Sequence, residues 1–210
     1  MRLTVFGATG STGSHLVRQA LERGYHVTAV VRGQHEFPMH SNLRLITADV
    51  MNPGAIQTAV ADADAVLDAI GSREHGPTTV VADAAQSICK AMEATGTSRL
   101  IMVSNSAGTP GPGDEPFTRF VVKPLILRPL LRHSLIDMAR AETIVRDTDL
   151  DWTIVRAPQL TDNRPQGAYR TAVDRNVMFG IRITRGDLAR CMLDLIDIPQ
   201  TVRTHVHVAG

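Results

Sequence analysis

Short apolar runs alternate with amphipathic stretches over the first two-thirds of the chain. The apolar runs predict strands at Leu3–Phe6, His26–Val31, Leu43–Thr47, Ala65–Ala69, Arg99–Val103 and Trp152–Arg156. The amphipathic stretches predict helices at Ser14–Arg23, after Pro53, at Pro77–Thr95 and at about Ile136–Arg146. This alternation predicts an α/β fold in which a doubly wound parallel sheet carries helices on both faces.

The regular alternation ends at Gly108. Composition predicts a loop over Gly108–Gly113, and Pro124 and Pro129 predict that Phe117–Leu131 is not one continuous helix. Beyond Pro158 the pattern predicts short strands near Ala168–Val173 and Met178–Ile183, a helix at Asp187–Ile196 and a last strand at Thr204–Val208. We expect one domain over 1–210, with 108–133 as an inserted segment and about 158–184 as a small lobe.

Size and composition restrict the function. The chain has 210 residues, 43% hydrophobic and 20% charged, which is typical of one soluble globular domain. Its formal net charge of +1 gives no concentrated basic surface, so we expect no nucleic-acid partner. Cys89 and Cys191 fall in amphipathic patterns and are expected to be buried free thiols. Without a signal peptide or an uncharged apolar run of about 18 residues, we expect a cytoplasmic protein with no transmembrane segment.

The first predicted strand leads into a glycine-rich run, Gly7-Ala8-Thr9-Gly10-Ser11-Thr12-Gly13. Gly7 permits a sharp turn, Gly10 lets the backbone approach a pyrophosphate, and Gly13 lets the next helix pack on the sheet with its N-terminal N–H groups directed at the anion. Glycine turns also arise for packing reasons alone. In its setting between a strand and a helix, the run predicts a dinucleotide-binding turn.

The residue after the second strand bears on the choice between NAD and NADP. An acidic residue there would accept hydrogen bonds from the ribose 2′-hydroxyl, whereas this chain has Arg32 after Val30-Val31. A guanidinium suits a 2′-phosphate because it offers paired donors; the alternative is a surface arginine at the end of a strand. We therefore expect NADP(H) as the preferred cofactor, with NAD(H) possible.

Polar residues also follow the next three strands, at the edge where open α/β sheets bind ligands. Asp49 is either an acceptor for the adenine amino group or a solvated turn residue. Gly71-Ser72-Arg73 borders the cofactor, although Arg73 equally fits an exposed loop. The hydroxyls of Ser104-Asn105-Ser106 either bind a nicotinamide or a substrate carbonyl or serve the turn itself.

A tyrosine four residues before a lysine, the proton-donating pair of many reductases, is absent from the sequence. Gln86 and Arg119 precede the two lysines at that distance, and Tyr25 and Tyr169 lie elsewhere. This composition favours hydride transfer to an acceptor that stabilises the resulting anion or takes its proton from water.

Three further sequence features say less about the function. His205 and His207 share a strand face as two metal ligands would, but no third ligand has a suitable spacing, so we expect a surface strand and no metal. No Gly-x-Ser-x-Gly motif supports a serine hydrolase. The basic and apolar segment Phe117–Arg132 is a substrate lid, a membrane-surface element, a dimer contact or the packing of a small subdomain.

The chain resembles the atypical short-chain dehydrogenase/reductase group, which is NAD(P)-binding and NmrA-like. Within that group it is most similar to the biliverdin IXβ reductase / NAD(P)H-dependent flavin reductase family. The likeness is carried by Gly7–Gly13, Val30-Val31-Arg32, Asp49-Val50, Gly71-Ser72-Arg73, Pro77-Thr78-Thr79-Val80, Ser106-Ala107, 150–156, Gly167-Ala168-Tyr169 and Asp187-Leu188. Two departures concern the substrate side: Gln159 stands where the family has a histidine, and the stretch from Gly108 to about Arg140 is longer.

The resemblance implies a Rossmann-type fold and the positions of the site residues. The residues implied to line the cofactor are Gly7, Thr9, Gly10, Ser11, Thr12, Arg32, Asp49, Val50, Gly71 and Arg73. Gly13, Ser72 and Ser104 complete the expected cofactor site, and Pro158 begins a segment that flanks the nicotinamide. Ser106 is the first choice for a residue that binds the substrate, and Gln159 is the second. The inserted segment 108–133 and the small lobe at about 158–184 are expected to lie on the substrate side.

The resulting hypothesis is an NAD(P)H-dependent oxidoreductase. It would transfer hydride to a flavin-like, tetrapyrrole or quinone-like acceptor, with flavin as substrate rather than bound prosthetic group, and act as a monomer or homodimer. Arg128 and Arg132 would hold an anionic acceptor. The alternative is an NmrA-like redox sensor that binds NADP(H) without turnover; the absent tyrosine–lysine pair and the short C-terminal part disfavour a nucleotide-sugar epimerase.

Overall fold

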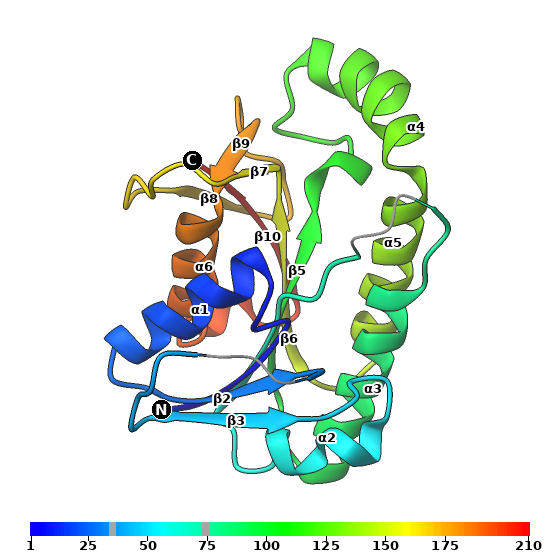
Figure 1. The fold of residues 1–210 in the computed structure, drawn as a ribbon. Helices are drawn as coiled ribbons and strands as arrows, with labels where there is room; N and C mark the ends of the chain where they lie inside the picture. The colour runs from blue at the N-terminus through cyan, green and yellow to red at the C-terminus, as the bar shows by residue number, and fades with distance from the viewer. Residues whose placement is uncertain (34–36, 73–75) are drawn as a thin grey trace.

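The computed structural model describes residues 1–33, 37–72 and 76–210. Its centre is an eight-stranded sheet in the order β3-β2-β1-β4-β5-β6-β10-β8, with helices on both sides (Figure 1). The strands of this sheet are β1 (Arg2–Phe6), β2 (His26–Val31), β3 (Leu43–Thr47), β4 (Ala65–Asp68), β5 (Arg99–Asn105), β6 (Asp151–Ala157), β8 (Arg170–Val173) and β10 (Thr204–Ala209). All neighbouring pairs are parallel except β10 with β8. The predicted doubly wound sheet is confirmed.

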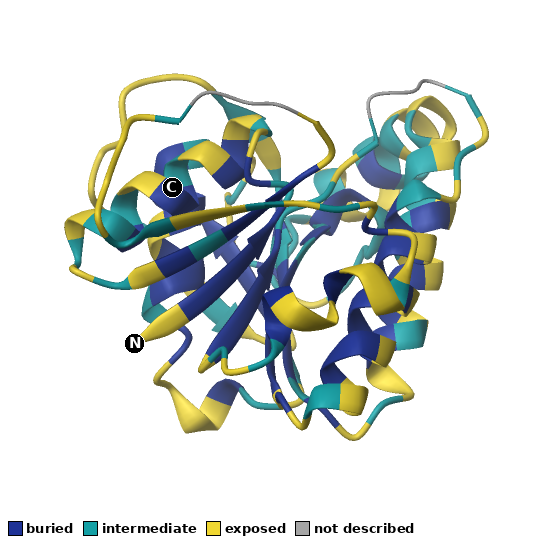
Figure 2. Ribbon diagram, turned by 60° about the horizontal axis from the view of Figure 1, so that its bottom comes forward, coloured by how far each residue is buried: buried dark blue, intermediate teal, exposed yellow. Residues whose placement is uncertain are grey.

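The helices form two layers that cover the sheet. Helices α1 (Ser11–Glu22) and α6 (Arg185–Asp194) pack on one face, and α2 (Pro53–Val60), α3 (Val80–Thr95) and α5 (Arg132–Arg146) pack on the other. Figure 2 shows the strands buried between them and the exposed residues on the outer helix surfaces. Cys89 and Cys191 are buried free thiols, as expected.

Strand β1 shows why a parallel strand of this fold is apolar at successive positions. Leu3 and Val5 contact the core under α1 and α6, and Phe6 contacts the core under α3. The one polar residue of this stretch, Thr4, is buried because its hydroxyl donates to the Ala59 carbonyl at 2.5 Å. A strand covered on both faces needs apolar side chains on both.

The segment after the first predicted loop is more helical than its prolines suggested. Residues Thr118–Leu127 (η2) form a π-helix that continues into α4 (Arg128–Leu130) and then α5. The Arg128 N–H bonds to the Lys123 carbonyl, five residues back. Because this wider turn accommodates the Pro124 ring, the prediction of an interrupted segment is wrong.

The predicted strand Met178–Ile183 is confirmed only for its last two residues, because the observed strand β9 is Arg182–Thr184. Strand β9 pairs with β7 (Gln159–Thr161) in a separate two-stranded sheet. Residues 178–181 instead form a turn in which Phe179 has φ of 55°. The Phe179 N–H donates to the Glu115 carboxylate and the Gly180 N–H to the Val177 carbonyl, so the chain reverses before it can pair.

The expectation that His205 and His207 lie on a surface strand is wrong. Strand β8 returns antiparallel beside β10, so β10 is internal and His207 is only 4% exposed. No group of three or more residues able to hold a metal ion occurs among the described residues. Within the same part of the chain, no helix is long and apolar enough to cross a bilayer.

Asp137 on α5 caps helix α3. Its buried carboxylate accepts hydrogen bonds from the N–H groups of Val81 and Ala82, both at 3.0 Å. We expect Asp137→Ala to lower the free energy of unfolding by about 1–3 kcal/mol, because two buried donors lose their acceptor. Urea unfolding followed by circular dichroism measures this loss. The control Glu93→Ala, an exposed carboxylate on α3, should change stability by less than about 0.5 kcal/mol; an equal effect of both changes would contradict the capping role.

Candidate cofactor site

The chain changes direction across the sheet between β1 and β4. From β1 it moves outward through β2 and β3, then returns to place β4 on the other side of β1. Open α/β sheets form a crevice at such a point, beyond the carboxyl ends of the strands. The glycine run lies in this crevice, between the end of β1 and the start of α1.

Close packing explains the glycines of this turn. A Cβ on Gly13 would lie 2.0 Å from the Gly7 carbonyl oxygen, and a Cβ on Gly7 would lie 2.7 Å from the Ala69 backbone. Gly7 also has φ of +70°, in the left-handed region that favours glycine. The first turn of α1 is therefore drawn against the end of β1.

The amino end of α1 is left without a side-chain acceptor. Gly10 is its N-cap, and its first turn carries no acidic residue. By contrast, Asn52 caps α2, Thr184 caps α6 and Asp137 caps α3. Free N–H groups and the helix dipole attract an anion at this position, so the arrangement fits a dinucleotide pyrophosphate.

A cavity of about 300 Å³ lies beside this turn. Of the residues predicted from sequence, it is lined by Gly7, Thr9, Gly10, Arg32, Asp49, Val50, Gly71 and Ser72. It is also lined by residues that the sequence analysis did not select: Phe6, Val30, Val31, Ala48, Met51, Ala69, Ile70 and Val80. Most of these apolar residues are sequence neighbours of a predicted site residue. Their position next to the polar residue that follows a strand is the signal that could have identified them.

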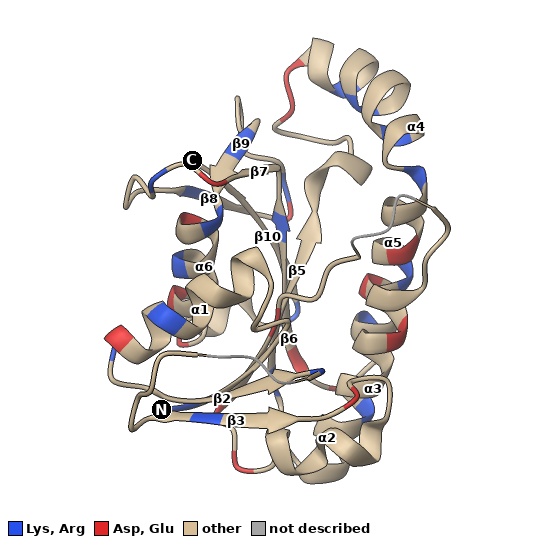
Figure 3. Cartoon of the chain, viewed as in Figure 1, with Lys and Arg blue, Asp and Glu red and all other residues tan. Residues whose placement is uncertain are grey.

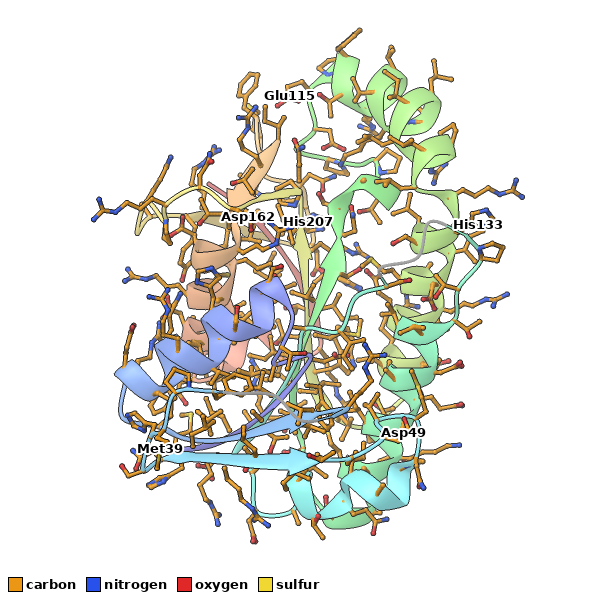
Figure 4. The ribbon with its side chains drawn as sticks, in the orientation of Figure 1. Met39, Asp49, Glu115, His133, Asp162 and His207 are labelled. Carbon is orange, nitrogen blue, oxygen red and sulfur yellow. The ribbon has the colours of Figure 1, made fainter. Side chains whose placement is uncertain are left out.

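Asp49 and Arg32 both line this cavity, just beyond the ends of β3 and β2. Figure 4 shows Asp49 beyond the end of β3. One carboxylate oxygen of Asp49 accepts the Met51 N–H at 3.0 Å, so the residue shapes its own turn while it lines the cavity. Arg32 is exposed just after β2, and no ion pair among the described residues includes it.

The other described residues that were predicted for the site do not line this cavity. Ser11, Thr12 and Gly13 form the first turn of α1, and Arg73 falls outside the described residues. Ser104 is buried at the end of β5, and its hydroxyl donates to the Glu142 carboxylate at 2.6 Å. Ser106 is buried in the short turn η1 (Ser106–Gly108), Pro158 is half-buried after β6, and Gln159 is exposed in β7.

A second hollow of about 310 Å³ opens at the carboxyl end of β5, between η1 and α5. Its lining is Ser104, Asn105, Gly108, Thr109, Arg128, Arg132, Leu135, Ile136, Met138, Ala139 and Glu142. It brings two exposed arginines together with aliphatic side chains. Arg132 and Ile136 also line a shallower hollow that includes Pro77–Thr79, just before α3. Hollows therefore extend from the first cavity, past the start of α3, to the carboxyl end of β5.

Glu142 is the centre of a buried polar network beneath the second hollow, and sequence reasoning missed it. Arg156 binds its carboxylate with two donors, at 3.1 and 2.5 Å. Burial opposes ionisation of Glu142, but hydrogen bonds from Arg156 and Ser104 and the charge of Arg156 hold its pKa below the ordinary value. The network fixes α5 to β5 and β6.

His207 is buried in the same region, on β10 opposite the β6 residue Arg156 (Figure 4). Burial, followed by the nearby charges of Arg156 and Lys123, lowers the pKa of His207 to about 4. The imidazole is therefore neutral at physiological pH, and its Nδ1 has no hydrogen-bond partner among the described residues.

Asp68 is a buried carboxyl at the end of β4, beneath α3. Burial raises its pKa to about 7, although the Ile70 N–H donates to it at 2.9 Å and favours the ionised form. In the unfolded chain an aspartate titrates near ~3.9. Between these values the folded state keeps a proton that the unfolded state releases, so this group lowers stability as pH rises from about 4 to about 7.

We expect Asp68→Asn to remove that pH-dependent loss. Relative to the wild type, the variant should gain stability as the pH rises from ~4 to ~8, by on the order of 4 kcal/mol in total, because a neutral amide replaces a carboxyl that resists ionisation. Urea unfolding at a series of pH values measures the difference. The exposed Asp147→Asn serves as the control and should follow the wild type. A stability difference for Asp68→Asn that does not vary with pH would contradict this account.

Curated relatives of the chain differ greatly in length. The uncharacterized protein Rv2047c of Mycobacterium tuberculosis is 26% identical over 159 residues, which are 74% of this chain but only 14% of that protein. The photosystem II assembly factor Ycf39 of Guillardia theta is 34% identical over 79 residues, 37% of this chain and 25% of Ycf39. YwnB of Bacillus subtilis is 22% identical over 206 residues, 95% of this chain and 94% of YwnB.

Solved structures share the whole fold. The oxidoreductase ylbE of Lactococcus lactis has a TM-score of 0.85 at 21% identity, over 100% of this chain and 91% of ylbE. A short-chain dehydrogenase/reductase of Veillonella parvula in complex with NADP scores 0.82 at 20% identity, covering 100% and 94%. ChuY, an anaerobillin reductase of Escherichia coli, scores 0.77 at 18% identity, covering 100% and 97%.

A family model described as NAD(P)H-binding matches residues 7–199, from the first glycine of the turn to the segment before β10. This span includes every residue that lines the first cavity except Phe6. The chain belongs to the NAD(P)H-binding family and has its Rossmann-type fold, of the kind seen in epimerases and short-chain dehydrogenases.

Proposed function

We propose that the protein is an NADPH-dependent reductase that passes hydride to a flavin-like or other conjugated acceptor, as in the biliverdin and flavin reductases that its sequence resembles. The observation that carries this proposal is the uncapped amino end of α1 beside a cavity that Arg32 borders. The NADP-bound structure of the Veillonella relative and the reductase activity in the name of ChuY support it. The cofactor supplies the hydride when bound.

This chain's own residues would bind and orient the two reactants. The Gly7–Gly13 turn and the first N–H groups of α1 would hold the pyrophosphate, and Arg32 the 2′-phosphate. Ala69, Ile70 and Gly71 would carry the nicotinamide end toward β5. The second hollow would take the acceptor, with Arg128 and Arg132 offered to its anionic groups and Leu135 to its ring system.

The available proton donors favour an acceptor of this kind. The Tyr169 hydroxyl donates to Asp194 on α6 at 2.5 Å, and burial together with that carboxylate raises its pKa. Lys123 is paired with Asp114 at 2.8 Å. Since neither side chain is free as an acid, the reduced acceptor would take its proton from water, which suits a conjugated product anion. Ser106 and Gln159 remain the predicted substrate-side hydrogen-bond donors.

The direct test follows absorbance at 340 nm in a mixture of protein and NADPH, with and without FMN, and again with NADH. We expect oxidation that depends on the acceptor and is faster with NADPH. Tight cofactor binding without oxidation by flavins, tetrapyrroles or quinones would contradict the reductase and support a sensor that binds NADP(H) without turnover.

Arg32 gives a sharper test of cofactor choice. Arg32→Ala should raise the KM for NADPH by about 10- to 100-fold and leave that for NADH within about threefold, because a charge-assisted contact to the 2′-phosphate is lost. Steady-state kinetics with each cofactor measures the two constants. Arg44→Ala, which removes an exposed arginine of β3, is the control and should change neither. Equal effects of Arg32→Ala on both cofactors would contradict the assignment.

A further inference from the structure

A helical arm projects from the carboxyl edge of the sheet. It comprises residues 117–130, that is, the π-helix η2 with the residue before it and α4 after it (Figure 1). Lys123 is the only buried residue of η2, and α4 has none. The arm is thus solvated along most of its surface.

Large apolar side chains cover this exposed arm. Phe117, Phe120, Leu125, Ile126 and Leu130 are between 53% and 76% exposed. Met178, Phe179 and Ile181, in the turn before β9, are 59–69% exposed. The Phe179 N–H donates to the Glu115 carboxylate, so that turn lies beside the amino end of the arm. We call these eight residues the apolar patch. Exposed apolar groups of this extent mark an interaction surface.

The charges of the arm are all of one sign. Residues 117–132 contain Arg119, Lys123, Arg128 and Arg132 and no acidic residue. Figure 3 shows basic residues along the arm and the nearest acidic one in the loop before it. Lys123 is neutralised internally by Asp114, each side chain being 6% exposed. The outward charges are therefore guanidinium groups, and that of Arg119 lies 5.2 Å from the Phe120 ring centre.

A buried network holds the arm in place. Lys123 donates to both carboxylate oxygens of Asp114, at 2.8 and 2.9 Å. Asn176 donates to Asp114 and to the Thr109 carbonyl, both at 2.9 Å. These bonds tie the arm to the loop before it and to the turn before β9. The patch is therefore formed before any partner binds, which lowers the entropic cost of association.

The charge pattern distinguishes between partners for this patch. In a symmetric contact with a second copy, the same arginines would face one another with no carboxylate in the arm to pair them. An anionic lipid surface instead offers phosphates to the guanidiniums and an apolar interior to phenylalanine and leucine. We propose that the apolar patch docks on the surface of an anionic bilayer, with Phe120 and Leu125 inserted and Arg119 at the headgroups.

Vesicle co-sedimentation of the full chain tests this proposal. The probes are phosphatidylcholine vesicles and vesicles of phosphatidylcholine and phosphatidylglycerol in equal amounts. We expect binding to the anionic vesicles that weakens with added salt, and little to the neutral ones. Phe120→Ser with Leu125→Ser should reduce the partition coefficient at least tenfold, and Arg119→Gln about fivefold.

The control substitutions are made in β3 and in the segment just before it, away from the arm. Met39→Ser with Leu45→Ser removes two exposed apolar side chains, and Arg44→Gln removes one exposed arginine; both should bind as the wild type does. Figure 4 shows Met39 distant from Glu115, which lies just before the amino end of the arm. Thermal unfolding confirms that each variant is folded.

Two results would overturn the proposal. One is vesicle binding that is absent, or that survives Phe120→Ser with Leu125→Ser. The other is a dimer in analytical ultracentrifugation that the same double change dissociates, with no vesicle binding by the wild type, which would assign the patch to a second copy.

Discussion

The contact between Gly13 and the Gly7 carbonyl fixes where helix α1 begins. With no side chain at either position, the first turn of α1 rests on the end of β1, beside Ala69 at the end of β4. The helix therefore starts over the point where the sheet changes direction, and its N-cap residue, Gly10, lines the 300 Å³ cavity. Strand order decides which loops meet there, and this backbone contact places the amino end of the helix at the meeting point, where it would attract an anion.

Several buried carboxylates in the described part of the chain have partners that hold them in place. Glu142 is satisfied by Arg156 and Ser104, Asp114 by Lys123 and Asn176, and Asp137 by the amino end of α3. At the cofactor edge the amino end of α1 has no side-chain cap, and Arg32 has no ion-pair partner among the described residues. An uncapped helix end beside an exposed arginine is a combination that suits a phosphate.

The parallel sheet and the glycine turn after β1 could be predicted from the sequence, because the residue patterns that specify them are local. A strand followed by Gly7 and Gly13 specifies the turn, and Arg32 marks the next strand end, without knowledge of distant residues. The features that could not be predicted involve partners far along the chain. His207 is buried because β8 returns beside β10, and Ser104 binds Glu142, 38 residues away. The arm stays helical through Pro124 because a π-turn, which no short pattern specifies, accommodates the ring.

The most direct test of the central claim is a crystal structure of the protein with NADP⁺. The account predicts the pyrophosphate at the first N–H groups of α1, the 2′-phosphate on Arg32, and the nicotinamide near Ile70 and Gly71, directed toward the second hollow. A cofactor bound elsewhere on the chain, or a cavity without NADP⁺ at saturating concentration, would contradict it.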